Sequence, residues 1–264
     1  MKRLIMAAAV PILATLAFGQ PTVFNGGLVN AASFAAGQVV APGSLNAIFG
    51  TQLADGLLIN DTVPFSANLG DVTVTINGVP APISFISPGQ VNVQMPWDVL
   101  PPGTTSGTVN VMLTNSHGSS TIQVGIAPAA PGIFMFTPSG YAVAANFADG
   151  AIAAPSGAIP GVFSHPAAIG DILTLYATGL GAVDSTPANG AASPDMLRNT
   201  IAIPNVLIGG TPAQVIFHGL SPQFPAVNQI NLIVSQGTPT GPSIPIQIQM
   251  GNITSTNQVL VAIQ

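Results

Sequence analysis

The sequence predicts an all-β protein made of two tandem immunoglobulin-like (TIG-like) β-sandwich domains formed by an internal repeat. Short segments alternate apolar and polar residues, and Gly, Pro and Asn turn signals separate them at regular spacing. No segment combines a helical period with helix caps. The third observation is the repeat itself, because residues 41–54 (APGSLNAIFGTQLA) and 168–181 (AIGDILTLYATGLG) align without a gap.

Residues 1–19 have the pattern of a secretory signal peptide. Lys2 and Arg3 precede an apolar run, and a small-x-small site ends at Gly19. The run is well short of the ~20 apolar residues that cross a bilayer. We therefore expect cleavage, no membrane insertion afterwards, and a mature chain that starts at Gln20 and is secreted or held at the cell surface.

Residues 20–264 carry almost no positive charge. One Arg stands against eight Asp, so the formal charge of this part is −7. A chain whose only cation is Arg198 cannot neutralise a run of phosphates, which excludes nucleic acid and anionic lipid surfaces as partners. The chain has no cysteine and is 48% hydrophobic. We expect a fold that is stabilised by burial alone, without disulfides.

The first sandwich is expected over residues 20–128. Residues 72–78 (VTVTING) alternate and stop at Asn77-Gly78, a strong turn dipeptide. Residues 106–115 and 121–127 alternate in the same way and are separated by a turn near His117. These segments predict antiparallel strands with one buried face.

Residues 129–139 are rich in Pro and Ala and predict a stiff linker. The remainder, residues 140–264, is expected to form a hairpin that turns at Asp149-Gly150 and then the second sandwich. Further strands are expected at residues 229–235, 244–250 and 257–264.

The repeat extends through both units. Residues 74–89 match 206–222, residues 90–96 match 229–235, and residues 108–126 match 245–263. Each unit therefore has the size of one immunoglobulin-like domain. We expect the aliphatic and aromatic positions of the copied strands to point into the core.

Several segments resemble an uncharacterised family, the Solibacter-type C-terminal domain found in secreted proteins of soil acidobacteria. They include residues 28–54, 86–97 (ISPGQVNVQMPW), 129–134, 148–152 and 170–181 (GDILTLYATGLG). The resemblance runs from about Val29 to the C-terminus. It implies a tandem β-sandwich and export, but no activity and no catalytic residues. The family usually forms the tail of larger exported proteins, whereas here it spans nearly all of the mature chain.

The sequence predicts no enzyme and no cofactor. A G-x-S-x-G nucleophile motif is absent, a P-loop is impossible without lysine in residues 20–264, and Cys/His zinc spacing is missing. His117, His165 and His218 lie next to turns or in loops, where solvated or turn-capping roles are expected.

No metal site is assigned, although calcium is the metal that the sequence disfavours least. Asp55 and Asp61 bracket one loop, and Asp184 and Asp195 bracket another. Loop carbonyls could complete the oxygen ligands that calcium needs. Asp is also a favoured turn residue, and both interpretations stay open.

The segment SPGQVNVQMPWDV (87–99) contains the candidate ligand-binding residues. Strand alternation places Gln94 on one face together with Gln90 and Asn92, and Trp97 and Asp98 follow. Amide groups beside an aromatic ring suit neutral sugars, because amides bond hydroxyl groups and a ring stacks on the sugar face. We therefore assign Gln94, Trp97 and Asp98 to a ligand site. The alternative is that Trp97 packs at the seam between the domains.

The repeat separates shared residues from unique ones. Gln90 and Asn92 recur as Gln229 and Asn231, so we expect them to serve the common fold by satisfying backbone groups at the sheet edge. Trp97 has no counterpart in the second unit.

Two functional classes remain. The first is a non-enzymatic module, secreted or on the cell surface, that binds a neutral polysaccharide or a protein partner. The alternative is a structural or adhesive subunit that assembles through strand edges, for which residues 257–264 are a candidate because they form a terminal, nearly uncharged strand.

Overall fold

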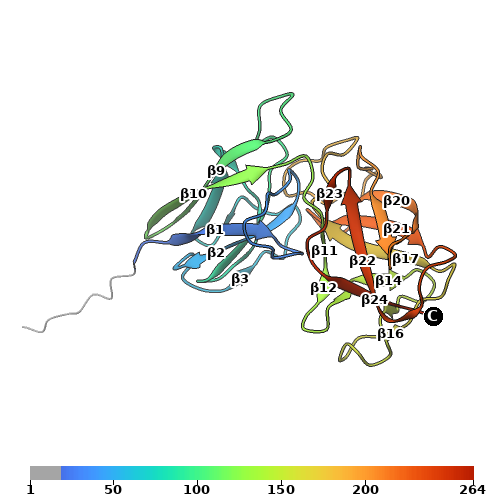
Figure 1. Cartoon of the computed structure of the whole chain (residues 1–264). Helices are drawn as coiled ribbons and strands as arrows, with labels where there is room; N and C mark the ends of the chain where they lie inside the picture. Colours follow the sequence, from blue (N-terminus) through green and yellow to red (C-terminus); the bar gives the residue numbers. More distant parts are fainter. Residues whose placement is uncertain (1–18) are drawn as a thin grey trace, which may run out of the picture.

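The computed structural model describes residues 19–264 and shows two β-sandwiches side by side along the chain (Figure 1). The predicted signal peptide, except for Gly19, lies outside the described residues. Across the described part, no helix is long and apolar enough to cross a membrane.

The first sandwich consists of sheets A and B. Sheet A has the strand order β1-β2-β8-β7-β3, and sheet B has the order β10-β9-β5-β4, with β6 beside β5. The strands of sheet A are β1 Thr22–Asn30, β2 Leu45–Thr51, β3 Leu58–Ile59, β7 Ile83–Ile86 and β8 Gln90–Gln94. Those of sheet B are β4 Asn68–Leu69, β5 Val72–Ile76, β6 Val79–Pro80, β9 Gly107–Asn115 and β10 Gly118–Ile126.

The second sandwich consists of sheets C and D. Sheet C has the order β16-β15-β14-β17-β21-β20, with β11 beside β17. Sheet D has the order β12-β13-β24-β22-β18-β19, with β23 beside β22. The strands of sheet C are β11 Gly132–Ile133, β14 Ala144–Asn146, β15 Ile152–Ala153, β16 Ser164–His165, β17 Ile172–Thr178, β20 Gln214–Leu220 and β21 Asn228–Ile233. Those of sheet D are β12 Met135–Phe136, β13 Tyr141–Ala142, β18 Asn205–Ile208, β19 Thr211–Pro212, β22 Gly241–Met250, β23 Ile253–Thr254 and β24 Val259–Ile263.

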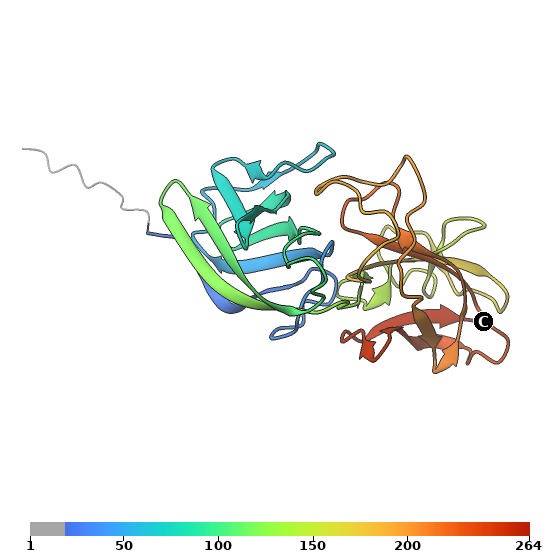
Figure 2. The same ribbon diagram turned by 90° about the horizontal axis from the view of Figure 1, so that it is seen from above.

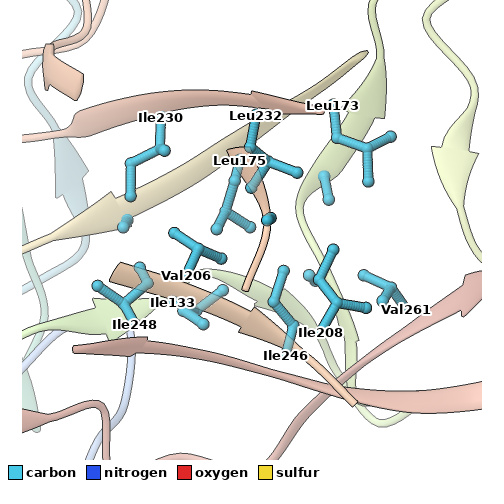
Figure 3. Packing of buried hydrophobic residues seen from close by; sticks show 14 of the residues in the cluster. Ile133, Leu173, Leu175, Val206, Ile208, Ile230, Leu232, Ile246, Ile248 and Val261 are labelled. Carbon is cyan, nitrogen blue, oxygen red and sulfur yellow. The ribbon is translucent and has the colours of Figure 1, made fainter. Parts of the chain in front are cut away.

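Alternation along the strands produces both cores. In β5, Val72, Val74 and Ile76 are buried while Thr73 is exposed. The strand ends at Ile76 and is followed by Asn77 and Gly78, which both have positive φ, as a tight hairpin turn requires. The second core is formed in the same way by branched aliphatic side chains from sheets C and D that face one another (Figure 3). Each fully buried side chain of this kind contributes about 1.5–3 kcal/mol.

These two sandwiches confirm the predicted fold class, tandem immunoglobulin-like domains. The repeat is also visible in the strand register. Phe49 on β2 lies opposite Gln90 on β8, and Tyr176 on β17 lies opposite Gln229 on β21.

The expectation that the aromatic positions of the repeat point inward is wrong. Ile48 and Leu175 are fully buried in the cores, whereas their neighbours Phe49 and Tyr176 are only partly buried. Because successive side chains of a strand point to opposite faces, both rings lie on the outer face of their sheet.

Residues 129–139 form part of the second sandwich rather than a linker. Within this stretch β11 pairs with β17 and β12 pairs with β13, and Ile133 is fully buried. A Pro/Ala-rich composition predicts stiffness, but Ile133 provides enough apolar surface to join the core. The hairpin that turns at Asp149-Gly150 forms as predicted, with Ala145 opposite Ile152.

The C-terminal strand is not an edge. Strand β24 pairs antiparallel with β22 and parallel with β13, so it lies inside sheet D. Its Val259, Val261 and Ile263 are buried. The predicted assembly through residues 257–264 therefore lacks a free backbone edge.

Candidate binding surfaces

A loop of the second sandwich reaches back to the first (Figure 2). We call residues 182–199, between β17 and β18, the clasp. At its tip, Phe65 N–H donates to the Gly190 carbonyl at 2.9 Å, and Gly190 N–H donates to Oε1 of Gln94. A Cβ at Gly190 would lie 2.5 Å from the Phe65 carbonyl oxygen, which is a clash, and 3.2 Å from Cβ of Pro82, so only glycine fits at this position.

Trp97 lies at this seam. Its ring packs directly on Gly43, where an added Cβ would overlap the ring atoms. Its backbone N–H donates to Oδ1 of Asn189 in the clasp at 3.0 Å. The indole Nε1 is buried without an acceptor among the described residues. The Trp97 ring thus packs within the first sandwich, and its backbone N–H contacts the clasp of the second.

Asp98 and Gln94 also contact the clasp. Oδ1 of Asp98 accepts from Nδ2 of Asn189 at 3.2 Å. Gln94 is only 1% exposed, because Gly190 covers its amide. The three residues assigned to a ligand site therefore come together, but on the side of the seam where the clasp packs. Their role in ligand binding stays a prediction. No sequence pattern points to Asn189 and Gly190, because their contacts depend on how a long loop packs against the other sandwich.

One ion pair stiffens the base of the clasp. Both terminal nitrogens of Arg198 donate to the Asp195 carboxylate, at 2.6 and 2.9 Å, and one of them also donates to Ser193 at 2.7 Å. This pairing lowers the pKa of Asp195 to about 2. Arg198, the only Lys or Arg of residues 20–264, therefore binds within the clasp.

The prediction that the amides shared by the two units lie at sheet edges is wrong. Strands β8 and β21 are each flanked by two strands. Within each strand the glutamine donates to the asparagine two residues on, from Gln90 to Asn92 at 2.8 Å and from Gln229 to Asn231 at 2.9 Å. All four side chains are half-buried, and the carbonyl oxygen of each glutamine and the amide group of each asparagine keep hydrogen-bonding capacity for solvent.

Aromatic rings flank each amide pair on the same outer face. In sheet A, Phe49 lies opposite Gln90 and Phe85 lies opposite Asn92. In sheet C, Tyr176 lies opposite Gln229 and Phe217 lies opposite Asn231. We call these groups the first platform (Phe49, Phe85, Gln90, Asn92) and the second platform (Tyr176, Phe217, Gln229, Asn231). A β-bulge precedes Phe85 and Phe217 alike, so the local backbone is repeated too.

A further phenylalanine stands beside each platform. Phe34 lies 6.1 Å from Phe49 and Phe224 lies 6.1 Å from Tyr176, measured between ring centroids. Both are 49% exposed. Phe34 has φ of 52°, an outlier for a bulky residue, and two backbone N–H groups bound to Oδ1 of Asn30 hold its turn.

An apolar groove at the seam between the sandwiches is a second candidate binding surface. It has a volume of about 550 Å³, and its lining includes Leu180, Ile201, Met250 and Ile253. A mostly aliphatic lining offers little hydrogen bonding to hydroxyl groups. The platforms, which combine rings with amides, suit a neutral sugar better.

Each histidine has an internal partner. His117 lies 2.9 Å from Asp55, and His165 lies 2.8 Å from Asp149. The Asp149 hydrogen bond raises the pKa of His165, whereas burial lowers the pKa of His218. Nδ1 of His218 lies 2.8 Å from the Thr200 hydroxyl, which donates to the Ala202 carbonyl.

Three of the four aspartates considered for calcium bind protein donors, and Asp55 does so through His117. Asp184 accepts from the backbone and side chain of Asn199 at 3.2 Å, and Asp195 binds Arg198. In the part of the chain that the structure describes, no three His, Asp or Glu residues gather where they could hold a metal ion.

Comparison with known proteins adds little. No protein-family model matches the chain, and no curated protein matches its sequence. Among solved structures it is similar to the I9–I11 tandem of titin, with 9% identity, a TM-score of 0.22, and coverage of 93% of this chain and 65% of the tandem. A surface glycan-binding protein of Bacteroides uniformis, from a xyloglucan utilization locus, gives 10% identity, a TM-score of 0.27 and coverage of 92% and 49%.

Domains 5–6 of the S-layer protein SbsC give 10% identity, a TM-score of 0.26 and coverage of 92% and 98%. The chain spans about half the length of the Bacteroides protein. At these TM-scores the likeness adds nothing to the fold that the strand pairing defines.

Proposed function

We propose that this chain is a non-enzymatic extracellular module that binds neutral polysaccharide through the outer faces of its sheets. One observation carries the proposal: half-exposed aromatic rings flank an amide pair on the outer face of both sandwiches. Rings stack on the apolar faces of sugars, and amides serve their hydroxyl groups. The platforms contain no charged residue, which favours a neutral polymer over an acidic one.

The rest of the molecule is compatible with this role. The sequence pattern of residues 1–19 supports export to the cell surface or beyond. The histidines are engaged with Asp and Thr side chains or backbone, which supports a non-catalytic assignment. Membership in the Solibacter-type family, as the sequence segments suggest, is part of the same proposal.

Affinity electrophoresis of residues 20–264 tests the proposal. We expect gels that contain a neutral polysaccharide (hydroxyethyl cellulose, galactomannan or dextran) to retard the protein, and gels with polygalacturonate to leave it unretarded. Phe49→Ala combined with Tyr176→Ala should abolish the retardation, while circular dichroism shows an intact fold. If the protein migrates in every neutral-polysaccharide gel as it does in a gel without polysaccharide, the proposal is contradicted.

Self-assembly remains the second candidate, now through a different edge. Strand β3 is the edge strand of sheet A; its Ile59 is 67% exposed, and Leu57, which precedes it, is 63% exposed. An exposed apolar edge strand can pair with another chain. Sedimentation equilibrium tests this: a monomer at all concentrations rules it out, whereas a dimer that Ile59→Lys dissociates supports it.

A further inference from the structure

The two platforms share their amide residues, although the inward residues of the same strands differ. On the aligned strands β8 and β21 the Gln and Asn of the platforms are identical, whereas the inward residues change from Val91 to Ile230 and from Val93 to Leu232. The third outward position, outside the platforms, changes from Gln94 to Ile233. Surface positions outside special features tolerate substitution within about ±0.5 kcal/mol, so stability alone gives little reason to keep outward amides. A shared function of the outer face explains this pattern.

Each platform keeps unused hydrogen-bonding groups in a fixed arrangement. The bond from glutamine to asparagine orients both amides and leaves an acceptor on Gln90 and donors on Asn92, with the same arrangement at Gln229 and Asn231. Neighbouring hydroxyl groups of a sugar both donate and accept. The rings that lie opposite these amides in the register supply the stacking surface.

The clasp keeps the two platforms in one spatial relation. Gly190 and Asn189 bind the first sandwich, and Leu45 N–H donates to the Thr178 hydroxyl across the seam at 2.8 Å. The clasp covers sheet A at Gln94, but Gln90 and Asn92 on the same face stay partly exposed. Two sites in a fixed relation bind a repeating polymer with a high effective concentration.

On the basis of the proposed function, we infer that the module is bivalent: each platform is one sugar-binding site, and both engage the same class of neutral polysaccharide. Short oligosaccharides then occupy the platforms independently. A polymer engages both and binds more tightly than the oligosaccharide, by ~10²-fold or more.

Nuclear magnetic resonance of ¹⁵N-labelled residues 20–264 tests this inference directly, because the side-chain NH₂ signals of the four platform amides report each site separately. The probe is the hexasaccharide of whichever polysaccharide retards the protein, cellohexaose for hydroxyethyl cellulose. We expect saturable shifts at both amide pairs. The variant Gln90→Ala/Asn92→Ala should keep the shifts at Gln229 and Asn231, and Gln229→Ala/Asn231→Ala should keep those at Gln90 and Asn92.

Polymer affinity gives the second readout. Each two-residue variant should lose about tenfold or more in affinity for the polysaccharide and keep its hexasaccharide affinity at the intact platform. The matched control is Gln247→Ala/Gln249→Ala, which removes two amides from the outer face of sheet D that lie opposite Leu207 and Asn205. This control should bind like the unmodified protein.

The outcomes separate the two proposals. Shifts at one platform only, or unchanged polymer affinity in either variant, overturn bivalence and leave glycan binding standing. If no neutral polysaccharide binds the unmodified protein, the proposed function fails and bivalence fails with it. Binding that survives the loss of both platforms overturns the assignment of the site and keeps the function.

Discussion

The two sandwiches follow one pattern and differ most clearly where they meet. Gly43 and Gly170 occupy the same position of the repeat, and both have positive φ, 75° and 94°. Trp97 covers Gly43, whereas nothing lies within 4 Å of the place where a Cβ of Gly170 would stand. The glycine turn is thus common to both copies of the repeat, and only Gly43 also packs against an aromatic ring.

The largest effect is expected for Gly43→Ala measured against Gly170→Ala. Both changes force an L-residue into a left-handed conformation, which costs about 1–2 kcal/mol. Only Gly43→Ala must also displace the Trp97 ring, and overpacking of this kind adds about 1–3 kcal/mol. Urea unfolding measures both losses, and the emission of the single Trp should change in Gly43→Ala alone. Equal losses would show that Trp97 is not fixed on Gly43.

A second pair of glycines tests the clasp. Gly190 and Gly237 both have φ of 83°, but only Gly190 fits against Phe65 and Pro82. Gly237→Ala carries the backbone strain alone, about 1–2 kcal/mol. We expect Gly190→Ala to cost about 1–3 kcal/mol more and to open residues 182–199 to limited proteolysis. A clasp that stays protease-resistant in Gly190→Ala contradicts the tight fit of its tip.

The ion pair at the clasp base predicts a smaller, pH-dependent effect. The folded pKa of Asp195 is lowered to about 2 by Arg198, so the pair's contribution is complete above the unfolded value of about 3.9. It is lost as pH falls from there through about 2. Asp195→Asn should flatten the acid limb of stability against pH while other aspartates still titrate. An unchanged slope would mean that the pair does not stabilise the fold.

The smallest effects are expected at two histidines that shift in opposite directions. The pKa of His165 is raised by Asp149, so its contribution is present below about 6.5 and fades as pH rises through the folded value. The pKa of His218 is lowered by burial, so its contribution is present above about 6.5 and fades as pH falls toward the folded value. Titration of the imidazole ¹H signals should place His165 above and His218 below 6.5. The reverse order contradicts both assignments.

Much of the fold could be predicted because alternation and turn chemistry act locally. The segment 72–78 specifies β5 and its turn through residues that are adjacent in sequence. The inward direction of Phe49 and Tyr176 was predicted wrongly, since both faces of β2 and β17 carry apolar residues and hydrophobicity alone does not choose between them. Residues 129–139 were misassigned because two-residue strands leave no periodic signal.

The site was harder to predict, since its residues meet through long-range contacts. The sequence brought attention to Trp97 and Gln94, and the structure gives both a partner nearly a hundred residues away. The amides of the platforms were dismissed as scaffold because they are repeated. Strand alternation places them on one face, but only the strand pairing shows that aromatic residues lie opposite each amide pair in both units, and this supports two sites.

The position of β24 has a consequence for biosynthesis. Every strand of the first sandwich precedes residue 127, so this unit can close while the rest of the chain is still being made. In sheet D, residues 259–263 lie between β13 and β22, so the β12–β13 pair and the β22–β18 pair join into one sheet only when this segment is present. The second sandwich must therefore wait for synthesis or export of that segment, and a ribosome that stalls shortly before it would leave one finished domain and one open sheet.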